Sequence, residues 1–311
     1  MKNPLLTLAL LAAASPARAF FDASLTQTFG PSKYAATRAW ADIGQSFHVK
    51  PQFSVYRSDT SNGSYKTFQA RGAYDTKVWG AGVTAGGTPK TNGYSNRFVG
   101  ADVNLSITPG MGGQIRRLTD NPEGKGPKGS GLARVDIGGA VFHTTHIDEL
   151  QFTPGGPLNN RAPGNAALRP GTRAKSIKIG QTDFTVNAGV SVFETLISAA
   201  LTRSRYDKDL AAIAAAPAAA ENVSGLNTII QGFPKTSVTA RVDLSMFPIV
   251  EPYVSLTRTT FYLGSPASTG VTVGATAGFE ILEVHASIEN YNPGGGSAKQ
   301  TYGSFGAGVR F

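Results

Sequence analysis

Residues 301–311, TYGSFGAGVRF, alternate between apolar side chains and small or polar ones as far as the last residue. The apolar positions are Phe305, Ala307, Val309 and Phe311. Successive side chains of a β-strand point to opposite faces, so a period of two places these four residues together on one face. The stretch therefore predicts a strand with one apolar and one polar face at the end of the chain.

A strand that ends in an aromatic residue, with apolar residues two, four and six positions earlier, resembles the closing strand of Gram-negative outer-membrane β-barrels. In that family the final aromatic residue is part of the signal read by the barrel assembly machinery. The resemblance implies that Phe305, Val309 and Phe311 carry this assembly signal. It also implies that the assembly machinery is a partner of the last strand.

The first residues have the pattern of a secretory signal peptide. Lys2 supplies a positive charge, residues 5–14 (LLTLALLAAA) form a short apolar core, and Ala17-Arg18-Ala19 is a small-x-small cleavage site. No segment approaches the ~20 apolar residues that a membrane-spanning helix needs. The chain has no cysteine, which fits the periplasm or the outer membrane better than a small disulfide-stapled secreted protein.

The composition also favours a barrel. The chain contains 37 Gly and only 16% charged residues, whereas soluble domains contain about 25%. Half of each membrane strand faces lipid, where charge is costly, so a barrel explains the deficit. A soluble β-sandwich is the alternative, but the Gly, Ser, Thr and Asn of the polar face cannot pack a dry core.

Alternating segments recur fourteen times between residues 43 and 311, separated by six short and seven long connections. The short ones are 75–76, 108–110, 143–145, 192–194, 247–249 and 280–282, and the long ones are 57–64, 86–94, 119–131, 153–173, 206–234, 263–268 and 291–300. Short periplasmic turns and long outer loops are typical of outer-membrane barrels. We predict an all-β, transmembrane, antiparallel up-and-down barrel of about 14 strands, with 12 or 16 as alternatives, in the outer membrane.

The predicted domain organisation has three parts. Residues 1–19 form the signal peptide, residues 20–42 an N-terminal segment, and residues 43–311 the barrel. The N-terminal segment is expected either in the periplasm or as a plug inside the lumen, and an additional strand is the alternative.

Strand alternation predicts which charged and histidine side chains line the lumen. They are His48, Lys50, Arg71, Asp102, Arg134, Asp136, Asp183, Arg241, Asp243, Glu283, His285, Glu289 and Arg310. Five are basic and six acidic, so the wall is expected to be nearly balanced in charge. Such a wall produces either a transverse field across a water-filled pore or a salt-bridged lumen that keeps the barrel rigid.

The surplus of positive charge, +9 for the whole chain, falls mostly in loops and at strand ends. These residues are Arg116, Arg117, Lys125, Lys128, Arg161, Arg169, Arg173, Lys175, Arg203, Arg205 and Lys208. Cations at the outer rim can pair with lipopolysaccharide phosphates, so we expect outer-membrane lipid and lipopolysaccharide as partners. Attraction of anionic solutes is the alternative. The charges are too dispersed for a nucleic-acid site.

Two histidine groups are candidates for chemistry. His143 and His146 are separated by two residues, as metal-binding histidines can be. On a strand, however, residues three positions apart point to opposite faces. His48 and His285 lie on the first and thirteenth predicted segments, which a closed barrel brings near each other. Hydroxyls are common in any lumen, and no motif of an outer-membrane hydrolase accompanies these histidines. We therefore predict no metal, no cofactor and no catalytic residue.

The function expected from the sequence is passive diffusion of small polar solutes through a porin-like channel. A fatty-acid-transporter-like barrel with an N-terminal plug is one alternative, and a closed structural or surface-binding barrel is the other. The Ala-rich residues 209–220 are expected to form a loop helix that constricts the pore. No feature of the sequence indicates an oligomeric state.

Overall fold

In the computed structural model the described residues form fourteen β-strands. The structure describes residues 20–59, 64–76, 78–91, 94–107, 133–150, 175–192, 195–208, 233–244, 247, 249–262, 264–279 and 281–310. This part of the chain contains no helix that is long and apolar enough to cross a membrane.

Each strand pairs antiparallel with the strands before and after it, and β1 pairs with β14, so the sheet closes into a barrel. The strands are β1 (Phe20–Gly30), β2 (Tyr34–Gly44), β3 (Phe47–Arg57), β4 (Tyr65–Asp75), β5 (Trp79–Thr91), β6 (Tyr94–Ser106), β7 (Ala133–Leu150), β8 (Lys175–Val192), β9 (Thr195–Tyr206), β10 (Pro234–Leu244), β11 (Val250–Phe261), β12 (Ser268–Phe279), β13 (Leu282–Asn292) and β14 (Gln300–Arg310). This confirms the predicted up-and-down barrel of about fourteen strands.

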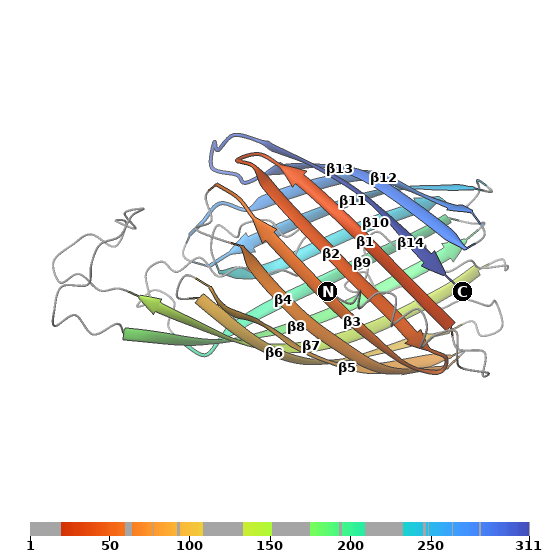
Figure 1. The fold of residues 1–311 in the computed structure, drawn as a ribbon, viewed down its shortest axis with the longest axis horizontal. Coiled ribbons are helices and arrows are strands. Elements are labelled where there is room, and N and C mark those ends of the chain that lie inside the picture. Colours follow the sequence, from red (N-terminus) through yellow and green to blue (C-terminus); the bar gives the residue numbers. More distant parts are fainter. Residues whose placement is uncertain are drawn as a thin grey trace, which may run out of the picture.

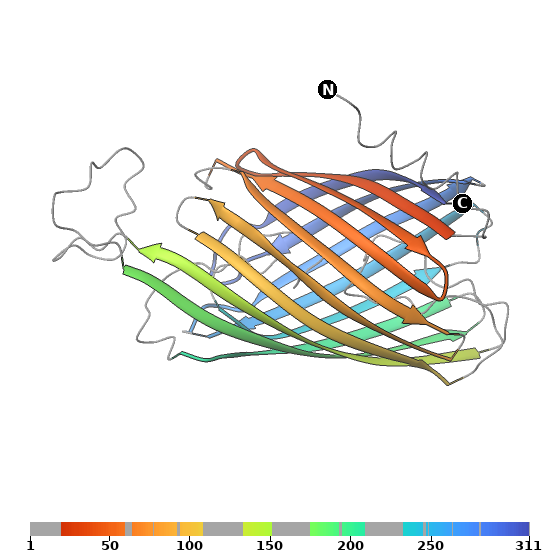
Figure 2. The same ribbon diagram turned by 60° about the horizontal axis from the view of Figure 1, so that its bottom comes forward.

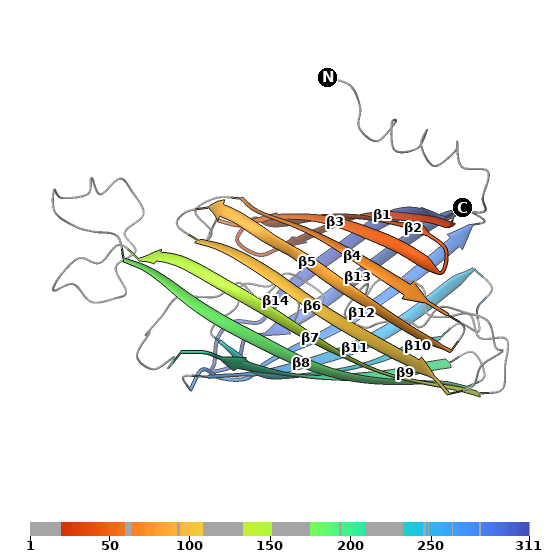
Figure 3. The ribbon, with the colours of Figure 1, turned by 90° about the horizontal axis from the view of Figure 1, so that it is seen from below.

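The strands cross the barrel at a steep tilt, and β1 begins at the same end at which β14 finishes (Figures 1 and 2). We call this the terminal end and the opposite one the distal end. The β7–β8 hairpin projects beyond the other strands at the distal end (Figure 3), because both of its strands have 18 residues. In outer-membrane barrels the short turns face the periplasm. The short turns from β2 to β3 and from β8 to β9 lie at the terminal end. The distal end is therefore oriented toward the cell exterior.

The two faces of the wall differ in chemistry. Side chains on the outside are apolar and exposed, as for Phe47 (66% exposed) and Val83 (58% exposed). Side chains on the inside are polar and buried, as for Thr26 (4% exposed) and Thr84 (4% exposed). This is the reverse of a soluble β-protein, whose apolar face is the buried one.

The prediction that residues 20–42 form a periplasmic segment or a plug was wrong, and the alternative, a strand, is closer to the structure. These residues are neither periplasmic nor a plug, because they form β1 and most of β2 in the wall. The barrel therefore begins at Phe20 and not at residue 43. In β2 the run from Ala35 to Ala41 includes Ala36 and Ala39, so small residues lie on both faces and the apolar contrast that marks a strand is weak. A tight turn links the two strands, with Ser32 and Lys33 at φ of 54° and 52°.

Two predicted connections lie inside strands. The turn expected at 143–145 is absent from the described residues, and β7 continues through it to Leu150. Its residues include Thr144 and Thr145, which are β-branched and favour a strand. The loop expected at 86–94 belongs to β5 and β6, whose partners Thr91 and Tyr94 leave a connection of only two residues.

The predicted first segment (43–56) also spans a hairpin, because β2 ends at Gly44 and β3 begins at Phe47. The predicted strand at 111–118 lies outside the described residues, and β6 pairs directly with β7. β6 therefore ends and β7 begins at the terminal end, whereas the loop predicted at 119–131 was expected on the outside. The Ala-rich residues 209–220 also lie outside the described part.

Candidate functional site: the inner wall of the barrel

The inner wall carries rows of hydroxyl side chains that bond across neighbouring strands. Thr67 and Thr88 are 2.7 Å apart, Thr28 and Ser304 are 2.9 Å apart, and Thr239 and Thr257 are 3.0 Å apart, measured between hydroxyl oxygens. Each pair satisfies its own polar atoms at the wall. A polar inner surface of this kind tolerates water, whereas an unpaired buried hydroxyl would be costly.

The barrel is too wide for short side chains to fill. Fourteen strands spaced about 4.8 Å apart and tilted by about 40° give a backbone radius of about 14 Å. Ser and Thr side chains from opposite walls cannot meet across such a space. The larger inward side chains therefore decide how much of the lumen the wall itself occupies.

Several of these larger side chains lie flat against the wall over glycines of a neighbouring strand. The guanidinium of Arg71 on β4 lies over Gly82 on β5 and reaches Asp102 on β6, with N–O distances of 3.0 and 3.1 Å. His285 on β13 lies over Gly306 on β14 and bonds to Thr26 on β1 at 3.0 Å.

The same arrangement recurs at four other glycines. The pairs are Tyr302 over Gly30, Phe142 over Gly100, Glu289 over Gly270 and Tyr253 over Gly274. In all six cases a methyl group on the glycine would overlap the side chain that covers it. Inward glycines therefore allow long side chains to lie along the wall instead of projecting into the lumen.

A second ion pair stands on the wall at β10 and β11. The Arg241 guanidinium donates to both carboxylate oxygens of Asp243, with N–O distances from 2.7 to 3.0 Å. It also stacks on the ring of Tyr253, 3.7 Å from the centroid. Both charged side chains are buried, so the pair is held in one orientation by hydrogen bonds and by the cation–π contact.

Acidic side chains gather at the terminal end. His48 is bonded through Nδ1 to Asp42 at 2.6 Å and through Nε2 to Asp75 at 3.0 Å, which ties β2, β3 and β4 together. Arg310 donates to Asp22 at 2.7 Å and has Glu283 4.0 Å away. Charge-assisted bonds of this type fix side chains where the barrel opens.

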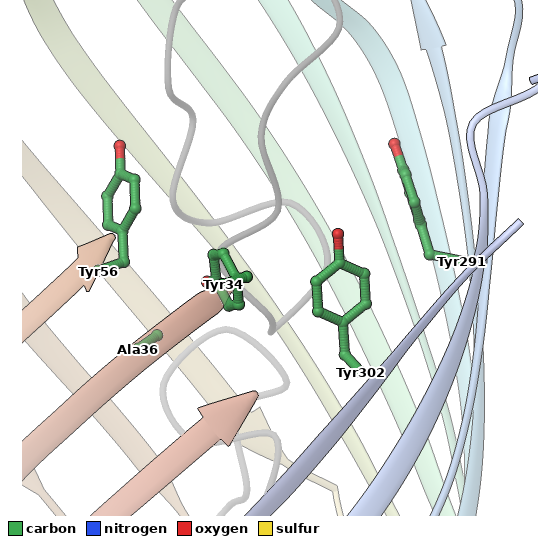
Figure 4. Packing of buried hydrophobic residues seen from close by; sticks show 5 residues of the cluster. All are labelled: Tyr34, Ala36, Tyr56, Tyr291 and Tyr302. Carbon is green, nitrogen blue, oxygen red and sulfur yellow. The ribbon is translucent and has the colours of Figure 1, made fainter. Parts of the chain in front are cut away.

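Tyrosines gather at the distal end. Eight of the ten tyrosines stand within two residues of a distal strand end, and we call this group the tyrosine collar: Tyr34, Tyr56, Tyr65, Tyr94, Tyr206, Tyr262, Tyr291 and Tyr302. Figure 4 shows four of them on one side of the wall. The rings contact each other, as in the edge-to-face pair Tyr34–Tyr302 (5.4 Å between centroids) and the stacked pair Tyr56–Tyr65 (5.2 Å).

A hydrogen-bonded chain links the collar to the wall below it. The Tyr94 hydroxyl is 2.8 Å from His146 Nδ1, and His146 Nε2 is 3.0 Å from Gln181 Oε1. The Gln181 amide donates in turn to Asp183 at 2.8 Å. An amide oxygen only accepts, so His146 carries a proton on Nε2 and donates it to Gln181. The chain makes this histidine a bridge across β6, β7 and β8.

Glu289 is an exception on this satisfied wall. It is 1% exposed, lies below the collar on β13, and its Oε2 has no hydrogen-bond partner. Its neighbours on the wall are Gly270 and Tyr302. A buried carboxyl group without a partner costs free energy, so this position is under strain or serves a purpose.

The structure places nearly all of the predicted lumen residues on the inner face. Those with described side chains are His48, Lys50, Arg71, Asp102, Asp136, Asp183, Arg241, Asp243, Glu283, His285, Glu289 and Arg310. The side chain of Arg134 lies outside the described part. In the closing strand Phe305 faces outward (56% exposed) and so does Val309, whereas Phe311 is not described.

The expected charge balance is different in the structure, because β1 and β2 add residues and two other acids, Asp75 and Glu251, were missed. The inner face of the described strands carries five basic side chains: Arg38, Lys50, Arg71, Arg241 and Arg310. It carries ten acidic ones: Asp22, Asp42, Asp75, Asp102, Asp136, Asp183, Asp243, Glu251, Glu283 and Glu289. This count omits Lys90, at the irregular tip of the β5–β6 hairpin. The described wall is therefore acidic and not balanced.

The histidines of the sequence analysis are not brought together. β14, β1 and β2 separate His285 on β13 from His48 on β3, so the expectation that they are close neighbours was wrong. His143 is exposed on the outer face of β7, while His146 is buried on the inner face. Within the described residues, no group of three His, Asp or Glu side chains could hold a metal ion.

The closed antiparallel sheet, the apolar outer belt and the polar inner face define the class of protein. The chain is a transmembrane β-barrel of the outer membrane, because only a closed sheet satisfies all its backbone hydrogen bonds in lipid. This agrees with the resemblance of the last strand.

Comparison with known proteins identifies no subfamily. No protein-family model and no curated protein matches the chain. Among solved structures it is similar to the outer-membrane protein OmpT of Vibrio cholerae, with 10% identity, a TM-score of 0.45, and 94% of this chain and 97% of that chain covered. It is also similar to the KdgM porin, with 4% identity, a TM-score of 0.41, and 93% and 99% covered. A third similar structure is a doubly substituted variant of OccD1 (OprD), with 10% identity, a TM-score of 0.40, and 95% and 96% covered.

Proposed function

We propose that the protein is a channel through which small polar solutes diffuse passively across the outer membrane. The observation that carries this proposal is the inner wall, whose long side chains lie flat over glycines and whose polar atoms bond along the wall. A wall of this kind surrounds a wide space without filling it. The proposal needs no catalytic step, and both ring nitrogens of His48 are already bonded to carboxylates.

The proposed channel favours cations. The inner face of the described strands has twice as many acidic as basic side chains, although the whole chain has a net charge of +9. A permeating ion responds to the field of the wall it passes, and a ring of carboxylates attracts cations. Asp75 and Glu283 are the accessible members of the acidic group at the terminal end, at 25% and 19% side-chain exposure.

Two alternatives remain as test outcomes. The transporter for hydrophobic compounds loses its proposed plug, because residues 20–42 form wall strands. The burial of the inward polar side chains favours a closed structural barrel. Single-channel recording in a planar bilayer separates the channel from both alternatives: steady conductance supports the channel, and silence of correctly folded protein refutes it in favour of a closed barrel or a carrier of hydrophobic compounds.

The selectivity test uses a KCl gradient across the bilayer. The reversal potential of the wild type is expected to show preference for K⁺ over Cl⁻. The D75N/E283Q variant should lower the cation-to-anion permeability ratio by roughly twofold or more, because two carboxylates leave the mouth. The matched control is D59N, whose carboxylate pairs with Lys33 in the distal turns, away from the terminal mouth. Anion preference in the wild type would contradict the assignment of the wall.

A further inference from the structure

The outer face of the barrel sorts charge by sign. Among the strand side chains that the structure describes, no Asp or Glu points outward. The outward charges are all cationic, leaving aside Lys90 and Lys235, which stand at register irregularities: Arg57, Lys66, Arg97, Lys178, Arg203, Arg205 and Arg258. All of them are exposed and all lie toward the distal ends of their strands. The described inner face holds ten acids and the described outer face none. Random placement of charge would not produce this separation.

The outward cations begin where the apolar belt ends. On β9 the outward Leu201 is followed two positions later by Arg203, and on β11 Leu256 is followed by Arg258. On β10 the exposed Lys235 stands at the distal register irregularity, on the distal side of the outward Val238. A cation at the first position beyond the hydrocarbon-facing residues lies at the level of the lipid headgroups.

Exposed distal cations are densest on three adjacent strands, β9, β10 and β11. We call Arg203, Arg205, Lys235 and Arg258 the cationic patch. The register pairs Arg203 with Thr236, the neighbour of Lys235, and pairs Arg258 with Val238. Neighbouring strands are about 4.8 Å apart and successive outward residues about 6.8 Å apart, so the four side chains can reach one headgroup.

The patch is not occupied by acids of the described chain. Arg205 lies over the ring of Phe184, 5.8 Å from its centroid, and Lys235 lies 5.7 Å from the ring centroid of Tyr262. Neither Arg203 nor Arg258 makes a hydrogen bond or an ion pair with another described residue. Three guanidinium groups therefore present free donors, and guanidinium is the side chain that binds phosphate oxygens in pairs.

We propose that the cationic patch binds the phosphate groups of a phosphorylated glycolipid of the outer leaflet, of the lipopolysaccharide type. The occupant is a lipid because the three arginines of the patch face away from the lumen and continue the lipid-facing belt. It is a lipid of the outer leaflet because the distal end faces the cell exterior in barrels of this class. The proposal rests on the barrel's orientation and is independent of the proposed channel.

The test compares two sets of exposed cations near the distal end. The mature protein is refolded in detergent and titrated with bisphosphorylated lipid A, and separately with the same lipid after removal of both phosphates. The patch variant is R203Q/R205Q/K235Q/R258Q. The matched control is R57Q/K66Q/R97Q, which removes outward cations from β3, β4 and β6. Retained β-sheet circular dichroism and resistance to unfolding in detergent show that each variant is folded.

The bisphosphorylated lipid should bind the wild type about tenfold or more tightly than the dephosphorylated lipid, since charge-assisted bonds are lost without the phosphates. The patch variant should lose about tenfold or more, and the control variant less than about threefold. Equal losses in both variants would overturn the proposal in favour of unspecific attraction. Unchanged affinity in the patch variant would also overturn it. A change of oligomeric state in the lipid-free patch variant would instead identify the patch as a contact between copies of this chain.

Discussion

Replacing Gly82 by alanine adds a methyl group where the Arg71 guanidinium lies against the wall. The methyl carbon would be 2.6 Å from Arg71 Cζ and 2.7 Å from Nε, so the guanidinium must move. Movement breaks the two bonds from Arg71 to Asp102, which measure 3.0 and 3.1 Å. Both groups are buried, at 7% and 8% side-chain exposure, so water replaces these bonds only in part.

The expected magnitude follows from these bonds. Two hydrogen bonds between charged groups contribute about 1.5 to 3 kcal/mol each, and partial hydration of the displaced groups returns some of this. Replacing a strand glycine by alanine gains about 0.5 to 1 kcal/mol in the absence of contacts. The net effect expected for G82A is a loss of about 1 to 3 kcal/mol in the free energy of unfolding.

The assay is reversible urea unfolding of the mature protein in lipid vesicles, followed by the fluorescence of Trp40 and Trp79. G72A is the matched control, because a methyl group on Gly72 meets no atom within 4 Å. It should be neutral or slightly stabilising. In an R71S/D102S background the cost of G82A should disappear, because no guanidinium covers the glycine. An equal cost of G82A in both backgrounds would refute the idea that the glycine exists to accommodate Arg71.

Three further predictions use the same unfolding assay or channel recording. E289Q should stabilise the protein by about 1 to 2 kcal/mol at pH 8, because an amide is less costly to bury than an unpartnered carboxylate; destabilisation would show that the carboxylate has an unseen partner. H48A should destabilise by about 2 to 4 kcal/mol, because Asp42 and Asp75 are left facing each other, and the triple variant H48A/D42N/D75N should recover most of this loss; failure to recover would mean that the ring packs rather than bridges. Y302A should increase single-channel conductance while the outward Y74A does not, if the tyrosine collar narrows the distal mouth; unchanged conductance in Y302A would remove the collar from the solute path.

The sequence predicted the fold class and the strand count, but several of its fourteen strands differed from those of the barrel. The C-terminal strands were placed well because Val, Leu and Phe on one face contrast with Thr, Ser and Gly on the other. The same rule missed β2, where alanines on both faces remove the contrast. It divided β7 with a turn at residues 143–145, because a membrane strand of the expected length would end there. The β-branched Thr144 and Thr145 instead continue the strand.

The inner wall was predicted residue by residue but not as a set of contacts. Alternation assigns Arg71 and Asp102 to the same face, yet only the register across β5 shows that Gly82 lies between them. Long-range register also separates His48 from His285, since two unrecognised strands enter the seam. The tyrosine collar could have been found, because its members stand at or next to strand ends beside loops. That signal requires correct strand ends, which alternation alone does not supply.

Separation of charge between the two faces connects the proposed channel with the proposed lipid site. A period of two means that moving a charged residue by one position transfers it from lumen to lipid. On β9 the cations Arg203 and Arg205 point outward, while Ser204 and Tyr206 between and beyond them are inward. A shift of β9 by one residue would place two cations in an acidic lumen and remove the centre of the cationic patch. Register in this strand therefore sets both the field that solutes meet inside and the charge that lipids meet outside.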